Sequence, residues 1–131
     1  CLPARHFSGR GLKSNQSLWA SFLLSAPSLR VFMGGDSGYG THFRLINEQH
    51  PGIDWQYNED WRNIHILPYQ LKQAAKNLKV KKIVTVHHSK FALARHPWDE
   101  PLQNEECLKA DTAFSVSILQ IGKVLPLKRG Q

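Results

Sequence analysis

Three side chains that can bind metal ions lie at or near the predicted ends of strands: His6, Asp36 and His87. Imidazole and carboxylate groups are ligands that suit zinc, and also iron or manganese. One such residue alone is usually structural, since an aspartate before Ser-Gly is typical of a turn. Strand ends can converge on one point, however. The threefold placement therefore predicts a metal site.

The residues around Asp36 read "GGDSGYG", Gly34–Gly40. Glycine adopts backbone conformations that other residues avoid, and it brings no side-chain bulk. We therefore expect a sharp turn at the end of a strand, with open space around the carboxylate.

Other catalytic chemistries have weaker support. Ser89 lacks a GxSxG elbow, and the chain contains neither GxxxxGK[ST] nor GxGxxG. Cys107 lies in a predicted helix with no obvious base beside it. His42, His50 and His96 are interpreted as surface residues rather than ligands.

The composition is that of one globular domain, with 131 residues of which 41% are hydrophobic. No apolar run is long enough to span a bilayer, and no secretory signal is visible. The two cysteines, Cys1 and Cys107, show no CxxC spacing. Free thiols indicate a reducing compartment, so we expect a cytoplasmic protein.

The formal net charge of +7 raises the alternative of a basic module that binds nucleic acid or anionic membranes. The basic residues are scattered, and the dense stretch Lys76–Lys82 is typical of a helix C-terminus. It lacks interleaved aromatic residues, so specific nucleic-acid binding is not expected.

The first half of the chain reads as a hairpin followed by a helix. The runs Leu18–Ser25 and Leu29–Gly35 predict two antiparallel strands joined through Pro27. Thr41–Gln49 predicts a helix that Thr41 or Ser37 could cap.

The second half alternates helices with strands. Pro68 marks the start of a helix whose apolar face comprises Leu67, Leu71, Ala74, Ala75 and Leu78. A strand (Lys81–His88), a helix (Leu102–Ala110) and two short final strands or a hairpin should follow, with a polar loop at Tyr57–His65 before Pro68. This order predicts an α/β fold, in which functional groups collect at the carboxyl ends of strands.

Four stretches together resemble the metallo-β-lactamase-fold hydrolases, in the branch of N-acyl-phosphatidylethanolamine-hydrolysing phospholipase D and L-ascorbate-6-phosphate lactonase. They are "PARHFSGRGLKSNQSLWASFLL", "VFMGGDSGYGTHF", "YNEDWRNIHILP" and "VHHSKFALARHPWDEPL". The resemblance implies that residues 1–131 are a single partial domain, the C-terminal half of an αββα sandwich. This half should be mostly one mixed sheet with helices on one face.

The resemblance also implies roles for individual residues in a site with two metal ions, usually zinc. His6 matches a ligand of the first metal, Asp36 the bridging aspartate and His87 a ligand of the second metal. His65 matches a histidine near the substrate, a candidate catalytic group that contacts a phosphate or the leaving group. Trp61 is interpreted as a core or loop aromatic, with lining of the substrate pocket as the alternative.

The sequence departs from the family pattern in three places. The HxHxDH motif, which supplies four of seven ligands, is absent. A strand near Ile53 looks shortened to "GIDW", which should leave a gap in the sheet. Tyr69 stands where relatives often carry an acid.

These features leave two main functions open. One is a metal-dependent hydrolase of phosphodiester, lactone or related ester bonds. The other is a non-catalytic remnant or a fragment that requires a partner. Half a sandwich should expose an apolar sheet face, so we expect pairing with a missing N-terminal half or self-association.

Overall fold

The structure is a computed structural model that describes residues 1–6, 13, 17–59, 67–86, 99–111 and 113–127. Within these residues a single sheet of six strands has the order β1-β2-β3-β4-β5-β6. The strands are β1 (Leu2–Pro3), β2 (Ala20–Ala26), β3 (Leu29–Met33), β4 (Trp55–Glu59), β5 (Lys82–Val86) and β6 (Ser115–Ser117). The helices are α1 (His42–Gln49), α2 (Pro68–Leu78) and α3 (Glu100–Lys109).

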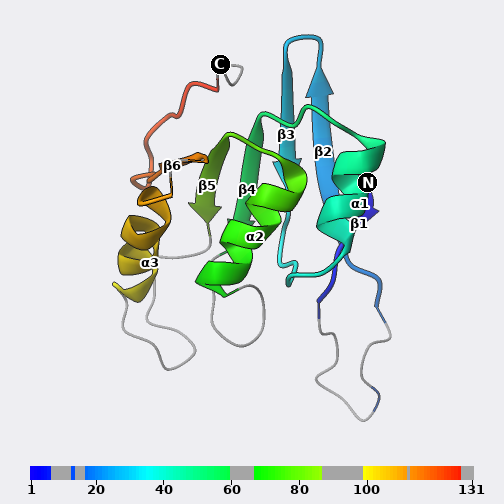
Figure 1. The fold of residues 1–131 in the computed structure, drawn as a ribbon, viewed down its shortest axis with the longest axis horizontal. Helices are drawn as coiled ribbons and strands as arrows, with labels where there is room; N and C mark the ends of the chain where they lie inside the picture. The colour runs from blue at the N-terminus through cyan, green and yellow to red at the C-terminus, as the bar shows by residue number, and fades with distance from the viewer. Residues whose placement is uncertain (7–12, 14–16, 60–66, 87–98, 112, 128–131) are drawn as a thin grey trace.

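The sheet is mixed, as expected. β1 pairs with β2 and β2 with β3 in antiparallel fashion, whereas β3, β4, β5 and β6 are parallel neighbours. In the described residues one helix lies between the two strands of each parallel pair in the chain, and all three helices lie in front of the sheet in Figure 1. Consecutive right-handed crossovers that proceed in one direction place their helices on one face. The prediction of an α/β sheet with helices on one face is confirmed.

The core between the sheet and the helices follows the predicted apolar pattern. Leu71, Ala74, Ala75 and Leu78 of α2 are fully buried. They pack with Phe43 and other residues of α1, α3 and the sheet in one cluster. Each large apolar side chain buried in this way contributes about 1.5–3 kcal/mol. Pro68 begins α2 as predicted, because the first turn of a helix needs no amide donor there.

The expected gap in the sheet is wrong. β4 lies between β3 and β5, where Val31 pairs with Trp55 and Trp55 with Lys82. The first residues of the predicted polar loop are thus a strand. Apolar and polar residues alternate over Trp55–Asn58, but the polar Gln56 is fully buried on the helical face, so polarity does not mark an exposed side of this strand.

Smaller differences concern the ends of elements. α3 begins at Glu100, two residues before the predicted start, and in the described residues after it β6 is one strand rather than two. Thr41 occupies the N-cap position of α1 but makes no capping hydrogen bond with its side chain. None of the described helices is long and apolar enough to cross a membrane.

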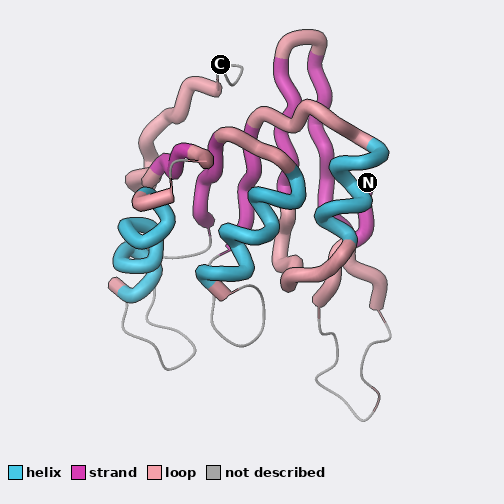
Figure 2. The backbone as a smooth tube through the Cα atoms, in the orientation of Figure 1, coloured by secondary structure: helices cyan, strands magenta, loops and turns pink. Residues whose placement is uncertain are grey.

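The second face of the sheet is apolar, and none of the described helices lies on it. Val31, Trp55 and Val84 form a cluster there, and Leu119 and Leu125, from the chain after β6, pack against it. The β2–β3 hairpin extends past the ends of the helices (Figure 2), and the apolar side chains on this face of it are exposed. Phe22 and Leu24 of β2 and Met33 of β3 are 51%, 55% and 43% exposed.

We expect the chain to self-associate through this open apolar face. Leu24→Lys should raise the monomer fraction, because a charge in the contact would have to lose its water. Leu45→Lys is the matched control, since Leu45 is a similarly exposed leucine (43%) on α1, on the opposite side of the sheet. Sedimentation velocity measures the effect, and a wild-type chain that stays monomeric at high concentration would contradict it.

Candidate functional site

The carboxyl ends of four strands lie at the same edge of the sheet. β1 and β3 are each antiparallel to β2, and β4 and β5 are parallel to β3, so all four run in one direction. His6 follows the end of β1 and Asp36 follows the end of β3, each by three positions. His87 comes directly after Val86, the last residue of β5, but lies outside the described residues. This edge is where α/β sheets place their ligands.

The glycine-rich stretch after β3 turns the chain as predicted. The Gly34 amide donates to the Tyr57 carbonyl oxygen at 2.8 Å, which continues the ladder with β4. Gly35 then has a φ of +57°, a left-handed conformation that favours glycine. Asp36 follows immediately and is half-buried.

Two hydrogen bonds of the Arg5 main chain bring the segments of His6 and Asp36 together. The Gly38 amide donates to the Arg5 carbonyl oxygen at 2.6 Å. The Arg5 amide donates to Ser37 Oγ at 3.1 Å. The residue before His6 is therefore bonded to the two residues after Asp36, although β2 separates their strands in the sheet.

The His6 ring is half-buried against Trp19. The two ring centroids are 4.2 Å apart and the planes meet at 86°, an edge-to-face arrangement. Such pairs add about 0.5–1.5 kcal/mol beyond their buried area. Trp19, which directly precedes β2, therefore helps to fix the orientation of the His6 imidazole.

The interpretation of His42 as a surface residue is wrong. It is half-buried at the start of α1, and its Nε2 lies 3.1 Å from Ser37 Oγ. Burial lowers the pKa of His42 below its ordinary value of 6.5, and the nearby Arg5 guanidinium lowers the pKa further. The imidazole is therefore neutral at pH 7. Sequence periodicity holds no signal for this contact, because the turn at Gly35 creates it.

The described residues supply two of the predicted ligands, His6 and Asp36. His87, His65 and Trp61 lie outside them, so their roles stay predictions. Among the described His, Cys, Asp and Glu side chains, no group of three or more is placed to hold a metal ion. An imidazole and a carboxylate are the right donor types for zinc, but a zinc site needs three or four protein ligands.

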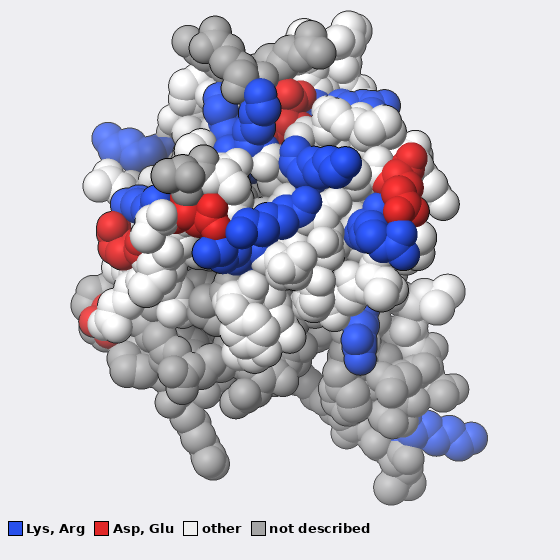
Figure 3. Space-filling view, viewed as in Figure 1, with Lys and Arg blue, Asp and Glu red and all other residues white. Residues whose placement is uncertain are grey.

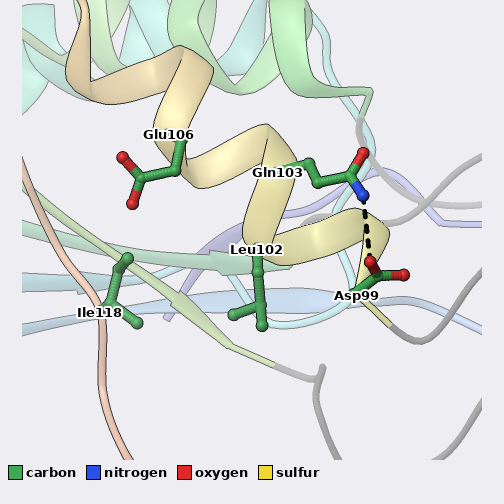
Figure 4. A pocket seen from close by; sticks show the side chains of 5 residues that line it. All are labelled: Asp99, Leu102, Gln103, Glu106 and Ile118. Carbon is green, nitrogen blue, oxygen red and sulfur yellow. Dashed lines mark hydrogen bonds between the residues drawn. The ribbon is translucent and has the colours of Figure 1, made fainter.

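A shallow hollow lies elsewhere, beside α3. It is lined by Asp99, Leu102, Gln103 and Glu106 together with Ile118 from the chain after β6 (Figure 4). Gln103 Nε2 donates to Asp99 Oδ2 at 3.1 Å, so these polar groups bond to each other. The hollow belongs to the β6 end of the sheet, whereas His6 follows β1 at the opposite end. It therefore forms no part of the candidate metal site.

We expect the imidazole of His42 to titrate below pH 6.5. Arg5→Gln should raise the pKa of His42 only part of the way toward 6.5, because burial, the larger cause, remains. Histidine side-chain NMR during a pH titration measures both values. A pKa at or above 6.5 in the wild-type chain would contradict this assignment.

The same shift predicts how stability depends on pH. The pKa of His42 is lower in the folded than in the unfolded state, so protonation favours unfolding. The contribution is fully present above pH 6.5 and is lost as the pH falls from 6.5 toward the folded-state pKa. Urea unfolding should show this decline in the wild type and in His50→Gln, but not in His42→Gln.

Comparisons with known proteins agree with this arrangement. A family model described as "Beta-lactamase superfamily domain" matches residues 1–88. Outer membrane protein RomA of Klebsiella pneumoniae is 47% identical over 92 residues, which are 66% of this chain and 70% of that protein. The mitochondrial N-acyl-phosphatidylethanolamine-hydrolyzing phospholipase D of Saccharomyces cerevisiae is 31% identical over 118 residues, 81% of this chain and 25% of that protein.

Two solved structures share the fold. Igni18, a metallo hydrolase from Ignicoccus hospitalis, gives a TM-score of 0.73 at 17% identity over 92% of this chain. The metallo-beta-lactamase fold protein YhfI from Bacillus subtilis gives a TM-score of 0.67 at 15% identity over 95% of this chain. The chain covers 48% of each of these structures. By its sequence and its fold, the chain belongs to the beta-lactamase superfamily domain family and has the metallo-β-lactamase fold.

Proposed function

We propose that this chain supplies one half of a metal-dependent hydrolase site that cleaves phosphodiester, lactone or related ester bonds. The observation that carries the proposal is the hydrogen bonding between Arg5 and the residues after Asp36, which joins two candidate ligand segments at one sheet edge. Family membership supports the reaction class, and the similarity to a phospholipase D supports the phosphodiester.

The donor groups suit two zinc ions, with manganese or iron as alternatives. His6 would hold the first ion, His87 the second, and Asp36 could bridge both because a carboxylate has two oxygens. When bound, such ions supply a hydroxide nucleophile at neutral pH and stabilise the developing oxyanion. The chain's own contribution is to hold one imidazole and one carboxylate at fixed positions on the sheet edge.

His65 and Trp61 complete the proposal. Both come after β4 in the chain, and the carboxyl end of β4 lies at the same edge of the sheet. We assign His65 to the substrate phosphate or the leaving group, to which a positioned imidazole can transfer a proton. Trp61 would line the substrate pocket.

A second candidate function is a fragment that requires a partner or has lost catalysis. It is favoured by the absence of HxHxDH from the chain and by the 48% coverage of both solved structures. We therefore propose that residues 1–131 are a partial domain and that the isolated chain is inactive. A missing N-terminal half would then provide the other ligands.

A basic binding module has less support. On the face shown in Figure 3, lysine and arginine side chains are interspersed with acidic ones. Lys72 and Lys76 both lie near Asp111 Oδ2, at 2.7 and 3.1 Å. One carboxylate thus offsets part of the positive charge of these two lysines, which weakens the case for a patch that binds an anionic partner. We place the chain in the cytoplasm, since Cys1 and Cys107 are exposed free thiols.

Zinc binding by the chain tests the first proposal. We expect the wild type to bind zinc weakly and Asp36→Asn to lower the affinity about tenfold or more, because an amide has no negative charge to offer two cations. His50→Gln is the control, since it removes an imidazole away from the site. Isothermal titration calorimetry measures binding, and release of nitrophenol from bis(p-nitrophenyl) phosphate measures hydrolysis.

The combined results separate the candidates. Zinc binding together with hydrolysis would establish a complete site. Zinc binding without hydrolysis would support the half that needs a partner. If zinc does not bind at all, or binds equally to Asp36→Asn, the metal-dependent function is wrong for this chain.

A further inference from the structure

The hydroxyl of Ser37 lies at the junction of the two candidate ligand segments. Ser37 is fully buried. Its Oγ accepts the Arg5 amide hydrogen at 3.1 Å and lies 3.1 Å from His42 Nε2. It also lies 3.1 Å from the Gly38 carbonyl oxygen. One oxygen atom thus contacts the end of the His6 segment, the Asp36 turn and the start of α1.

His42 has close neighbours of its own, Phe43 and Gly40, so it can keep this oxygen in place. Its ring lies 4.3 Å from the ring of Phe43, which is fully buried. Gly40 also approaches the imidazole closely, and a β-carbon at Gly40 would lie 2.9 Å from His42 Nδ1. Glycine at this position therefore leaves the room that the imidazole occupies.

The turn after Asp36 is also tied to the helical layer. The Tyr39 ring stacks on Phe43 at 6.0 Å, and Asn77 Nδ2 of α2 donates to the Tyr39 hydroxyl at 2.9 Å. The contacts of Ser37 and His42 therefore rest on a rigid support rather than on a free loop.

We propose that Ser37 and His42 are positioning residues for the metal site, which set the spacing between the His6 imidazole and the Asp36 carboxylate. This inference rests on the proposed function. Metal ligands must be placed within about 0.2 Å, and loss of an outer partner commonly costs 10- to 100-fold in affinity. The pair is not a serine–histidine nucleophile, because the buried Ser37 hydroxyl offers a substrate no access.

Three variants of the full 131-residue chain test the proposal. Ser37→Ala removes the shared oxygen, and His42→Leu removes its ring partner. His42→Gln keeps a side-chain N–H near the position of Nε2. Zinc is titrated into each chain while the His6 imidazole resonances are followed by NMR, which reports binding at this residue even when it is weak.

We expect Ser37→Ala and His42→Leu to weaken zinc binding at His6 about tenfold or more and His42→Gln to restore most of it. Ile53→Val serves as the control. It removes one buried methyl group just before the amino end of β4, whereas His6 and Asp36 follow the carboxyl ends of their strands. It should lower stability without weakening zinc binding. Urea unfolding of every variant shows whether the losses in stability are comparable.

Failure of the positioning role and failure of the metal site give different results. If Ser37→Ala and His42→Leu weaken zinc binding at His6 no more than Ile53→Val does, the positioning role is wrong. The metal site itself would then stand. A wild-type chain whose His6 resonances do not respond to zinc would overturn the metal site, and the positioning role with it. If Ser37→Ala fails to fold, the comparison of His42→Leu with His42→Gln decides the question, since equal affinities would overturn the role.

Discussion

The structure depends on one topological constraint: every crossover between parallel strands carries its helix over the same face of the sheet. α1, α2 and α3 join β3 to β4, β4 to β5 and β5 to β6, and each contributes side chains to one core cluster. Because the strands advance in one direction, the right-handed rule places all three described helices on one face and none of them on the other. The same rule brings the carboxyl ends of the parallel strands to one edge, where His6 and Asp36 lie. The position of the candidate site and the apolar face without a described helix therefore have one cause.

The edge gains its order from hydrogen bonds rather than from sheet pairing. β1 is short and contacts only β2 within the described sheet, so strand pairing alone would hold His6 loosely. The bonds from Arg5 to Ser37 and Gly38 bypass β2 and connect the two ligand segments directly. A buried hydroxyl with several partners can hold a unique geometry, because any alternative leaves a polar group without a partner. This is the kind of support that a functional site needs from its surroundings.

Much of the fold could be predicted from local patterns, and the failures have physical reasons. The apolar spacing of α2 and the β-branched run of β5 reflect side-chain burial, so they are visible in the sequence. β4 was missed because its apolar and polar residues alternate over only four positions, Trp55–Asn58, and the polar residue Glu59 follows. The candidate ligands His6 and Asp36 were found from their place after strands. The contact of His42 with Ser37 could not be found, because it depends on how the chain turns after β3. The contact of Trp19 with His6 could not be found, because it joins two segments that are not neighbours in the chain.

The chain after β6 has a consequence for any molecule that would cover the bare face. Leu119 and Leu125 already lie against the cluster of Val31, Trp55 and Val84. A covalently attached segment competes at an effective concentration in the millimolar range, so it is a persistent competitor for the part of the surface it covers. A partner that needs the entire face must displace it, whereas one that needs only the hairpin end, at Phe22 and Leu24, need not. The chain after β6 would thereby direct association toward the β2–β3 end of the sheet.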